Sequence, residues 1–326
     1  MGADIFRASP AAQRVFALAD AAVGLPLAKL CFEGPEETLR ETANTQPAIV
    51  ATSLALLAAL QEDAGAQLPP EGEPAITGPL TPAFVAGHSV GEYAALSAAG
   101  ALGIEDTLRL VRERGRLMRQ EGTVCPSGMA AVLGMDPATL ETVCAEATDE
   151  TRAALGGEAD AHPGMGRVVL ANDNAPGQIV ISGEQRALDR AMELARARGA
   201  KRVVPLSVSG AFHSPVMTPA AAGLARAIDA APLRAAAVPL IANITAQPLT
   251  SAADLRSELA RQIESPVQWT RSVEYMAGQG VEVFVEIGAG QVLAGLVKRI
   301  AKGATTLSIG SAADIASAAA RLRELL

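Results

Sequence analysis

Ser89 is the side chain in this sequence best placed to act as a nucleophile. It is the central residue of Gly87-His88-Ser89-Val90-Gly91, a G-x-S-x-G nucleophile elbow pattern. An apolar run over 82–86 and a helix-forming run over 92–99, with Gly100 as its stop, supply the required strand and helix. Backbone N–H groups at that helix start, including that of Val90, can stabilise an oxyanion. Gly87 and Gly91 are expected to keep the turn tight. An ordinary strand-to-helix turn is the alternative.

A serine nucleophile needs a general base, and the sequence contains three histidines. His88 adjoins Ser89, and adjacent side chains on a tight turn point apart. His162 lies in a Pro/Gly-rich stretch that we expect to hold it poorly. His213 follows a strand-like run and precedes Ser214-Pro215, a helix N-cap and first-turn proline. The positive helix end would favour a neutral imidazole, so His213 is the predicted base. A histidine that merely packs beside a helix cap is the alternative.

Arg114 is the charged residue whose position is most unusual. Residues 104–120 predict an amphipathic helix, and Arg114 projects from the middle of its apolar arc. A buried guanidinium needs a partner. That partner is either a carboxylate of the chain itself or a substrate carboxylate bound through two parallel hydrogen bonds. The residues alone favour neither.

The elements that must position these side chains form an α/β pattern. Residues 8–30 and 44–62 are predicted to be helical, and residues 63–81 to be a surface loop. A β-α-β-β-α-β unit, typical of a ferredoxin-like fold, follows the elbow. Its predicted strands are 129–133, 168–172, 178–182 and 202–208, its helices are 137–148 and 184–199, and 149–166 is a predicted mobile insertion. We therefore expect a large domain (1–126 and 208–326) that carries an inserted small domain (127–207).

Composition excludes several classes of protein. The net charge of −8 and the lack of a basic tract argue against nucleic-acid binding. The sequence shows no apolar run that approaches a membrane span and no signal peptide. Cys31, Cys125 and Cys144 lack metal-type spacing, and three histidines make a histidine-rich metal site improbable, so no metal is expected. Reduced thiols predict a cytoplasmic protein.

Several motifs in the same order resemble those of the bacterial malonyl-CoA:acyl carrier protein transacylases. The resemblance extends from the first helix to about residue 302. It rests on Gly87-His88-Ser89-Val90-Gly91-Glu92-Tyr93, Arg114-Gly115, Asn172-Asp173-Asn174-Ala175-Pro176-Gly177-Gln178, Gly210-Ala211-Phe212-His213-Ser214, Asn243, Ser265-Pro266-Val267-Gln268-Trp269-Thr270 and Glu286-Ile287-Gly288-Ala289-Gly290.

The resemblance implies an α/β-hydrolase-like large domain with a ferredoxin-like small domain, and ping-pong transfer of malonyl from malonyl-CoA to acyl carrier protein. Ser89 would carry the malonyl ester, His213 would be base and then acid, and Arg114 would hold the malonyl carboxylate. The backbone carbonyl of Gln268 would orient His213. The remaining implied substrate-binding residues are His88, Met118 and Phe212. No cofactor is implied, and we expect a monomer.

The sequence differs from this family at its start. Family members begin with a strand and a Gly-Gln-Gly-Ser-Gln loop whose glutamine gives a second oxyanion N–H. This sequence begins at Met1-Gly2-Ala3-Asp4, which resembles the family just after that loop. We expect a misassigned start site. One oxyanion donor is worth a factor of about 10²–10³ in rate.

Two other functions and two docking surfaces stay open at this point. A serine esterase would share the elbow, but the sequence lacks an HGGG-type segment. A non-catalytic scaffold that binds carrier protein is the second alternative. An acidic carrier protein needs a local basic patch. The candidates are the helical set Arg109, Arg112, Arg116 and Arg119, and the set Lys298, Arg299 and Lys302.

Overall fold

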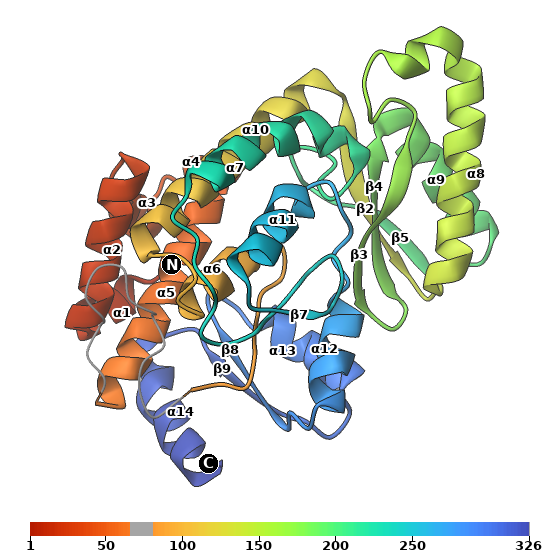
Figure 1. Ribbon diagram of the computed structural model, residues 1–326. Helices are drawn as coiled ribbons and strands as arrows, with labels where there is room; N and C mark the ends of the chain where they lie inside the picture. Colours follow the sequence, from red (N-terminus) through yellow and green to blue (C-terminus); the bar gives the residue numbers. More distant parts are fainter. Residues whose placement is uncertain (66–80, 326) are drawn as a thin grey trace.

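The computed structural model describes residues 1–65 and 81–325. The predicted loop at 63–81 lies mostly outside the described residues. The first part of the chain is a group of packed helices (Figure 1). These helices are α1 (Ala3–Ala8), α2 (Pro10–Val23), α3 (Leu27–Glu33), α4 (Glu36–Arg40) and α5 (Thr42–Asp63).

The helix predicted over 8–30 is broken in two. Gly24 ends α2 with a φ of 68°, a conformation that glycine adopts without strain, and Pro26 precedes α3. α5 is long and apolar enough to cross a membrane, contrary to the expectation that no such run exists. Its most apolar window is 78% buried inside the fold, where it packs against α2 and α7. α5 is therefore the central core helix.

Two small sheets stand beside these helices. In one, β1 (Val85–Ala86) pairs in parallel with β6 (Leu240–Ile241), which pairs antiparallel with β7 (Pro248–Leu249). In the other, β8 (Val283–Ile287) and β9 (Thr305–Ile309) are parallel. The helices that accompany them are α6 (Gly91–Ala98), α7 (Ile104–Val124), α10 (Thr218–Ala230), α11 (Ala252–Gln262), α12 (Trp269–Gly278), α13 (Val292–Ile300) and α14 (Ala312–Leu325).

A four-stranded antiparallel sheet forms a separate layer, at the right of Figure 1. Its order is β3-β4-β2-β5, and it has its own apolar core with α8 and α9. The predicted β-α-β-β-α-β order is confirmed; the first three strands and the first helix are longer than predicted, and the second helix and the last strand are shorter. They are β2 (Ser127–Leu133), α8 (Pro137–Leu155), β3 (Val168–Ala175), β4 (Gln178–Glu184), α9 (Gln185–Ala197) and β5 (Arg202–Pro205).

The predicted mobile insertion at 149–166 is wrong. α8 continues to Leu155, and a 3-10 helix (η1) follows it. Arg152 donates to two backbone carbonyls of the segment, and His162 Nε2 lies 2.8 Å from Glu121 Oε1 of α7. A Cβ at Gly164 would lie 2.5 Å from the Cα of Val216, so this segment packs tightly against the chain just after His213. His162 is therefore well held, and its partner is Glu121 rather than Ser89.

The four-stranded sheet is joined to the rest of the fold near the end of β3. Val267 N donates to Ala171 O at 2.8 Å, and Asp173 N donates to Val267 O at 2.9 Å. The register of β3 against β4 shifts between Leu170 and Asn172, which leaves Ala171 free to accept from Val267. This short parallel bridge holds the segment before α12 beside the sheet.

Candidate active site

The elbow forms as the sequence predicts, with a shorter strand. β1 ends at Ala86 and α6 begins at Gly91, and Ser89 lies between them with a φ of 53°. A left-handed backbone is strained for serine and persists only where its surroundings fix it. The Ser89 N–H donates to Asn243 Oδ1 at 2.7 Å, and Asn243 Nδ2 donates to Gly87 O at 2.7 Å. Asn243 therefore holds both sides of the turn.

Only one of the two elbow glycines is sterically required. A Cβ at Gly87 would lie 2.0 Å from the carbonyl carbon and oxygen of Gly91, whereas a Cβ at Gly91 would meet nothing within 4 Å. The expectation that Gly91 is needed to keep the turn tight is therefore wrong, because no described residue would contact a Cβ at this position. We predict that Gly87→Ala removes activity and lowers the melting temperature, because backbone must move. Gly91→Ala is the matched control and should melt close to the wild type. Thermal unfolding of both variants checks this, and equal stability would contradict it.

His213 is the histidine that reaches Ser89. Its Nε2 lies 2.7 Å from Ser89 Oγ. Its Nδ1 lies 3.0 Å from the backbone oxygens of Gln262 and Ser265. Carbonyl oxygens only accept, so Nδ1 carries the proton and Nε2 keeps a lone pair for the serine hydroxyl. The pair is arranged for general-base activation of Ser89, with two carbonyls where a triad would have a carboxylate.

The role expected for Gln268 belongs to other residues. The carbonyl of Gln268 accepts from Ser272, one turn into α12, and does not reach His213. Gln262 is the last residue of α11, where helical carbonyls lack partners within the helix. An imidazole N–H satisfies one of them. The glutamine named from the resemblance is therefore the wrong one, because the carbonyl oxygens that face Nδ1 of His213 belong to Gln262 and Ser265.

The cause of the neutral imidazole also differs from the expectation. β5 ends at Pro205, so His213 lies in a loop and has a φ of 59°. The residue is 3% exposed. Burial, and then the positive charge of Arg114, lower the pKa of His213 to about 3.

This shift predicts an unusual pH dependence. The rate of Ser89 acylation should stay level from about pH 8 to about pH 5, whereas an unshifted histidine would lose half its base form near pH 6.5.

The same shift affects the stability of the fold. Below about pH 6.5 the unfolded chain binds a proton at His213 that the folded protein excludes, so the free energy of unfolding falls as the pH falls from about 6.5 toward 3. Stopped-flow acylation across this range tests the first point, and unfolding of wild type against His213→Gln tests the second. A midpoint near 6.5 in the acylation profile would contradict the shift.

Arg114 lies in the same site as the serine. Its guanidinium is 1% exposed and donates to three neutral oxygens. They are Gln46 Oε1 at 2.6 Å, Gln262 Oε1 at 3.0 Å and Ser89 Oγ at 3.0 Å. Among the described residues no carboxylate is hydrogen-bonded to it. An ion pair within the chain, one of the two alternatives drawn from the sequence, is therefore not what holds this cation.

Comparison with known proteins identifies the family of this site. The model of the acyl transferase domain family matches residues 1–320. The chain belongs to the acyl transferase family. It is 40% identical to a malonyl CoA-acyl carrier protein transacylase of Bacillus subtilis, over 99% of this chain and 93% of the relative.

Solved structures of similar proteins have the same fold as this acyl transferase. A malonyl CoA-acyl carrier protein transacylase from Coxiella burnetii matches with a TM-score of 0.86 and 34% identity, over 99% of this chain and 93% of that one. A malonyl-transacylase solved with a type II PKS acyl carrier protein matches with a TM-score of 0.85 and 34% identity, over 98% and 94%.

The other predicted site residues of the acyl transferase differ in their burial and in the groups that they contact. Val90 is the N-cap residue of α6, and its N–H has no acceptor among the described residues. His88 Nε2 bonds Asn174 Oδ1 at 2.8 Å, its ring lies 5.6 Å from that of Trp269, and burial lowers its pKa. Met118 is buried and its sulfur accepts from Gln46 Nε2. Phe212 packs between the main core and a small cluster with Met129.

Three residues that hold the site together, Gln46, Glu92 and Gln262, were given no role in the sequence analysis. Gln46, on α5, bonds both Arg114 and Met118. Glu92 is completely buried and accepts hydrogen bonds from the Asn243 N–H and from Gln262 Nε2. Burial and the nearby Glu258 carboxyl raise the pKa of Glu92 well above its ordinary value. The one signal for Glu92 was its place in the elbow motif.

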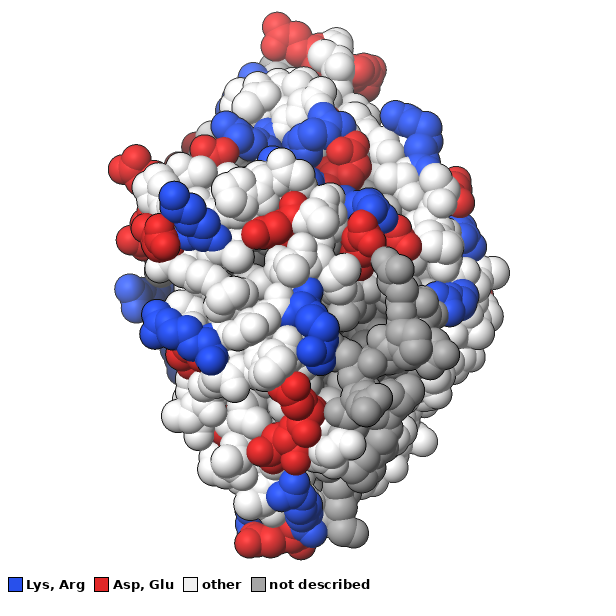
Figure 2. Space-filling model, turned by 90° about the vertical axis from the view of Figure 1, so that its left-hand side faces the viewer, with Lys and Arg blue, Asp and Glu red and all other residues white. Residues whose placement is uncertain are grey.

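Of the two basic sets considered for docking, the one on α7 is largely paired with carboxylates, whereas no ion pair among the described residues involves Lys298, Arg299 or Lys302. Figure 2 shows basic and acidic side chains interspersed over the face that it presents. The arginines on the outer side of α7 bind groups of the chain itself. Arg109 pairs with Glu105 and Asp106, Arg116 with Glu113 and Arg119 with Glu41, while Arg112 donates to Ala43 O and Asn44 Oδ1. Arg299 donates to Gln178 Oε1 and Pro176 O.

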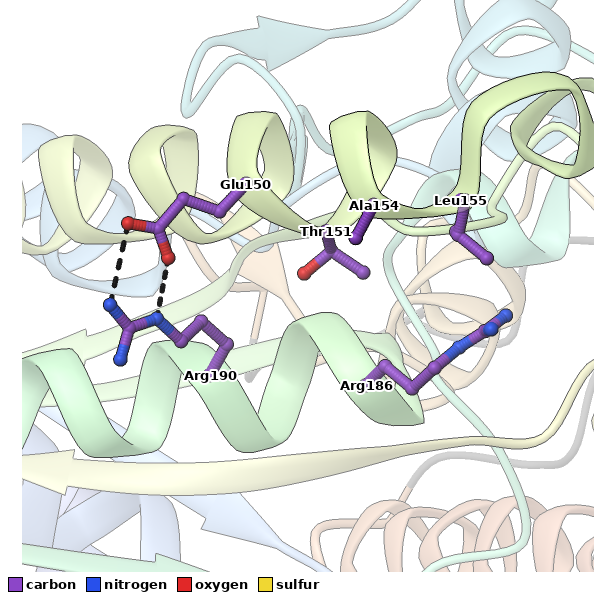
Figure 3. A pocket seen from close by; sticks show the side chains of 6 residues that line it. All are labelled: Glu150, Thr151, Ala154, Leu155, Arg186 and Arg190. Carbon is purple, nitrogen blue, oxygen red and sulfur yellow. Dashed lines mark hydrogen bonds and ion pairs between the residues drawn. The ribbon is translucent and has the colours of Figure 1, made fainter.

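A surface pocket lies away from Ser89, in the groove between α8 and α9 (Figure 3). Its walls include Glu150, Arg186 and Arg190, and Arg190 is already bonded to Glu150. Arg186 is bonded to Glu184. The three cysteines are free and buried. No group of three His, Cys, Asp or Glu among residues 1–65 and 81–325 is arranged to hold a metal ion.

Proposed function

We propose that this protein transfers the malonyl group of malonyl-CoA to the phosphopantetheine thiol of acyl carrier protein. One observation carries the proposal. Ser89 Oγ lies 2.7 Å from His213 Nε2 and 3.0 Å from Arg114 Nη2, so a base and a buried cation meet at one hydroxyl. The base suits acyl transfer, and the guanidinium suits an acyl chain that ends in a carboxylate. The names of its relatives support the same substrates.

The first half of the reaction forms the acyl-enzyme. His213 Nε2 takes the proton of Ser89 Oγ as the oxygen attacks the thioester carbonyl carbon. The Val90 N–H donates to the oxyanion that develops. When the carbon–sulfur bond breaks, His213 gives its proton to the departing CoA thiolate. The products are a malonyl ester on Ser89 and free CoA.

The second half reverses these roles. His213 takes the proton of the phosphopantetheine thiol, and the thiolate attacks the ester carbonyl. The carbon–oxygen bond to Ser89 breaks, and His213 returns the proton to Ser89 Oγ. Protons and bonds balance without a metal or a redox group, so we assign the protein no cofactor.

Arg114 is positioned to bind the malonyl carboxylate once the ester has formed. The Nη2 group donates to Ser89 Oγ when the serine is a free hydroxyl. Esterification makes this oxygen a much weaker acceptor, so that hydrogen becomes available to the carboxylate. Nε of Arg114 has no acceptor among the described residues. Two donors for two carboxylate oxygens give the geometry that a guanidinium prefers.

We also propose a division of the fold into two domains. A large α/β-hydrolase-like domain would comprise 1–126 and 208–326, and a ferredoxin-like domain 127–207. The order β3-β4-β2-β5, with α8 and α9 contributing to its core, supports the second assignment. The large domain supplies Ser89, Arg114, His213 and Gln262, while β3 of the small one supplies Asn174, the partner of His88.

Incubation with malonyl-CoA followed by intact-mass measurement tests the function. We expect one malonyl adduct, located at Ser89, which disappears when phosphopantetheinylated acyl carrier protein is added and reappears on that protein. Absence of an adduct would contradict the proposal. An adduct that is lost to water as fast as to carrier protein would instead indicate a hydrolase.

A further inference from the structure

Gln262 connects three parts of the site through one residue. Its backbone oxygen accepts from His213 Nδ1. Its side-chain Oε1 accepts from Arg114 Nη2 at 3.0 Å, and its Nε2 donates to Ser89 O at 2.9 Å and to Glu92 Oε2. Gln262 is completely buried. These contacts fix the side-chain amide, with its oxygen toward the cation and its nitrogen toward two acceptors.

Glu92 lies on the far side of that amide from Arg114. Both of its oxygens accept N–H groups, from Asn243 and from Gln262. The charged and titratable groups around it are Arg114 on α7, Tyr93 on its own helix and Glu258 on α11. One neutral amide, that of Gln262, therefore lies between the Arg114 guanidinium and the Glu92 carboxyl group.

This separation has a consequence for a substrate carboxylate. A buried guanidinium whose N–H groups lack acceptors is strongly unfavourable, so the Gln262 amide oxygen, held in place by Glu92, stabilises Arg114. A carboxylate in the place of this amide would neutralise the guanidinium and would repel the negative charge of the substrate. Glu92 fixes the orientation of the Gln262 amide, and the amide oxygen then accepts from Arg114 without bringing a negative charge to it.

We propose that Gln262, held by Glu92, is the positioning residue that keeps Arg114 both stabilised and open for a carboxylated acyl group. The inference rests on the proposed malonyl transfer. It assigns the Gln262 side chain to acyl-group selectivity and its backbone oxygen to the base. These two functions of Gln262 are separable by experiment.

The test exchanges the two side chains in the variant Glu92→Gln/Gln262→Glu. Net charge is unchanged and hydrogen bonds between positions 92 and 262 can still form, but the carboxylate now contacts Arg114. We expect the ratio of kcat/KM for malonyl-CoA to that for acetyl-CoA to fall about a hundredfold. Acetyl transfer continues, because the backbone oxygen of residue 262 still binds His213.

Gln262→Met is the second variant and removes the three side-chain hydrogen bonds, to Arg114, Ser89 O and Glu92. The ratio should fall about tenfold, as expected for a lost hydrogen bond to a charged group. Glu121→Gln is the matched control. Glu121 is a buried carboxylate on α7 that pairs with His162, and no hydrogen bond joins it to Glu92, Gln262 or Arg114 among the described residues, so the ratio should not change.

Two results would overturn the inference. In the first, the exchange and Gln262→Met variants keep the wild-type ratio. In the second, they lower malonyl and acetyl transfer equally, as a merely structural role would. The wild type and Arg114→Ala distinguish these results from a failure of the proposed function. If the wild type shows no malonyl preference, the function itself is wrong. If it does and Arg114→Ala removes it, only the role of Gln262 is in question.

Discussion

Replacing Ser89 by alanine is expected to abolish the malonyl adduct and to lower transfer about 10⁴-fold or more. The reason is that Ser89 Oγ is the only atom bonded to both His213 Nε2 and Arg114 Nη2 among the described residues. His213→Ala should cost a similar factor. The double variant should be no worse than either single one, because the two side chains act as one unit. Single-turnover acylation by malonyl-CoA measures all three.

Ser317→Ala is the control for this series. Ser317 is exposed on α14 and its hydroxyl donates only to Asp314 O, so its loss should leave the rate unchanged. Additive effects of the Ser89 and His213 changes would show that the two residues do not act together. A malonyl adduct that persists in Ser89→Ala would place the nucleophile elsewhere.

Replacing Arg114 by alanine is expected to lower kcat/KM for malonyl-CoA by about 10²–10³-fold. Acetyl-CoA has no carboxylate for the guanidinium, so its kcat/KM should change far less. The expected difference follows from the burial of Arg114 and from its position 3.0 Å from Ser89 Oγ. Steady-state rates with the two thioesters measure it.

Arg114→Lys is the matched control for charge without the planar fork. A lysine keeps the positive charge but cannot offer two parallel hydrogen bonds, so malonyl transfer should fall to an intermediate value. Equal losses for malonyl and acetyl transfer in Arg114→Ala would contradict a carboxylate-binding role. Thermal unfolding of each variant separates lost binding from lost folding.

The sequence predicted those parts of the site that depend on side-chain type and local pattern. Ser89 was recognisable from a turn flanked by a strand and a helix, and Arg114 from its place in the apolar arc of α7. His213 was predicted because His88 adjoins Ser89 and because His162 was expected to be poorly held; the second reason is wrong, since His162 is bound to Glu121. The structure places Nε2 of His213 against Ser89, although burial rather than a helix end accounts for its lowered pKa.

What the sequence did not predict depends on backbone atoms and on distant contacts. The orienting oxygen comes from Gln262 because α11 happens to end there, and a carbonyl has no sequence signature. Gln46 reaches Arg114 across the packing of α5 on α7. The segment 149–166 looked unstructured because it is polar and rich in glycine, yet Arg152 and the contact between His162 and Glu121 order it.

In the sequence, the segment that forms the four-stranded sheet separates the residues of the site into two groups. Ser89 and Arg114 precede that sheet, and His213, Asn243 and Gln262 follow it. The elbow at Ser89 has no base and no Asn243 to hold its left-handed turn until the chain has been made beyond residue 243, and Arg114 lacks Gln262 for longer still. During synthesis on the ribosome, we therefore expect Ser89 to stay without its general base while most of the polypeptide is being made. Its reactivity toward thioesters begins only when the last third of the polypeptide emerges.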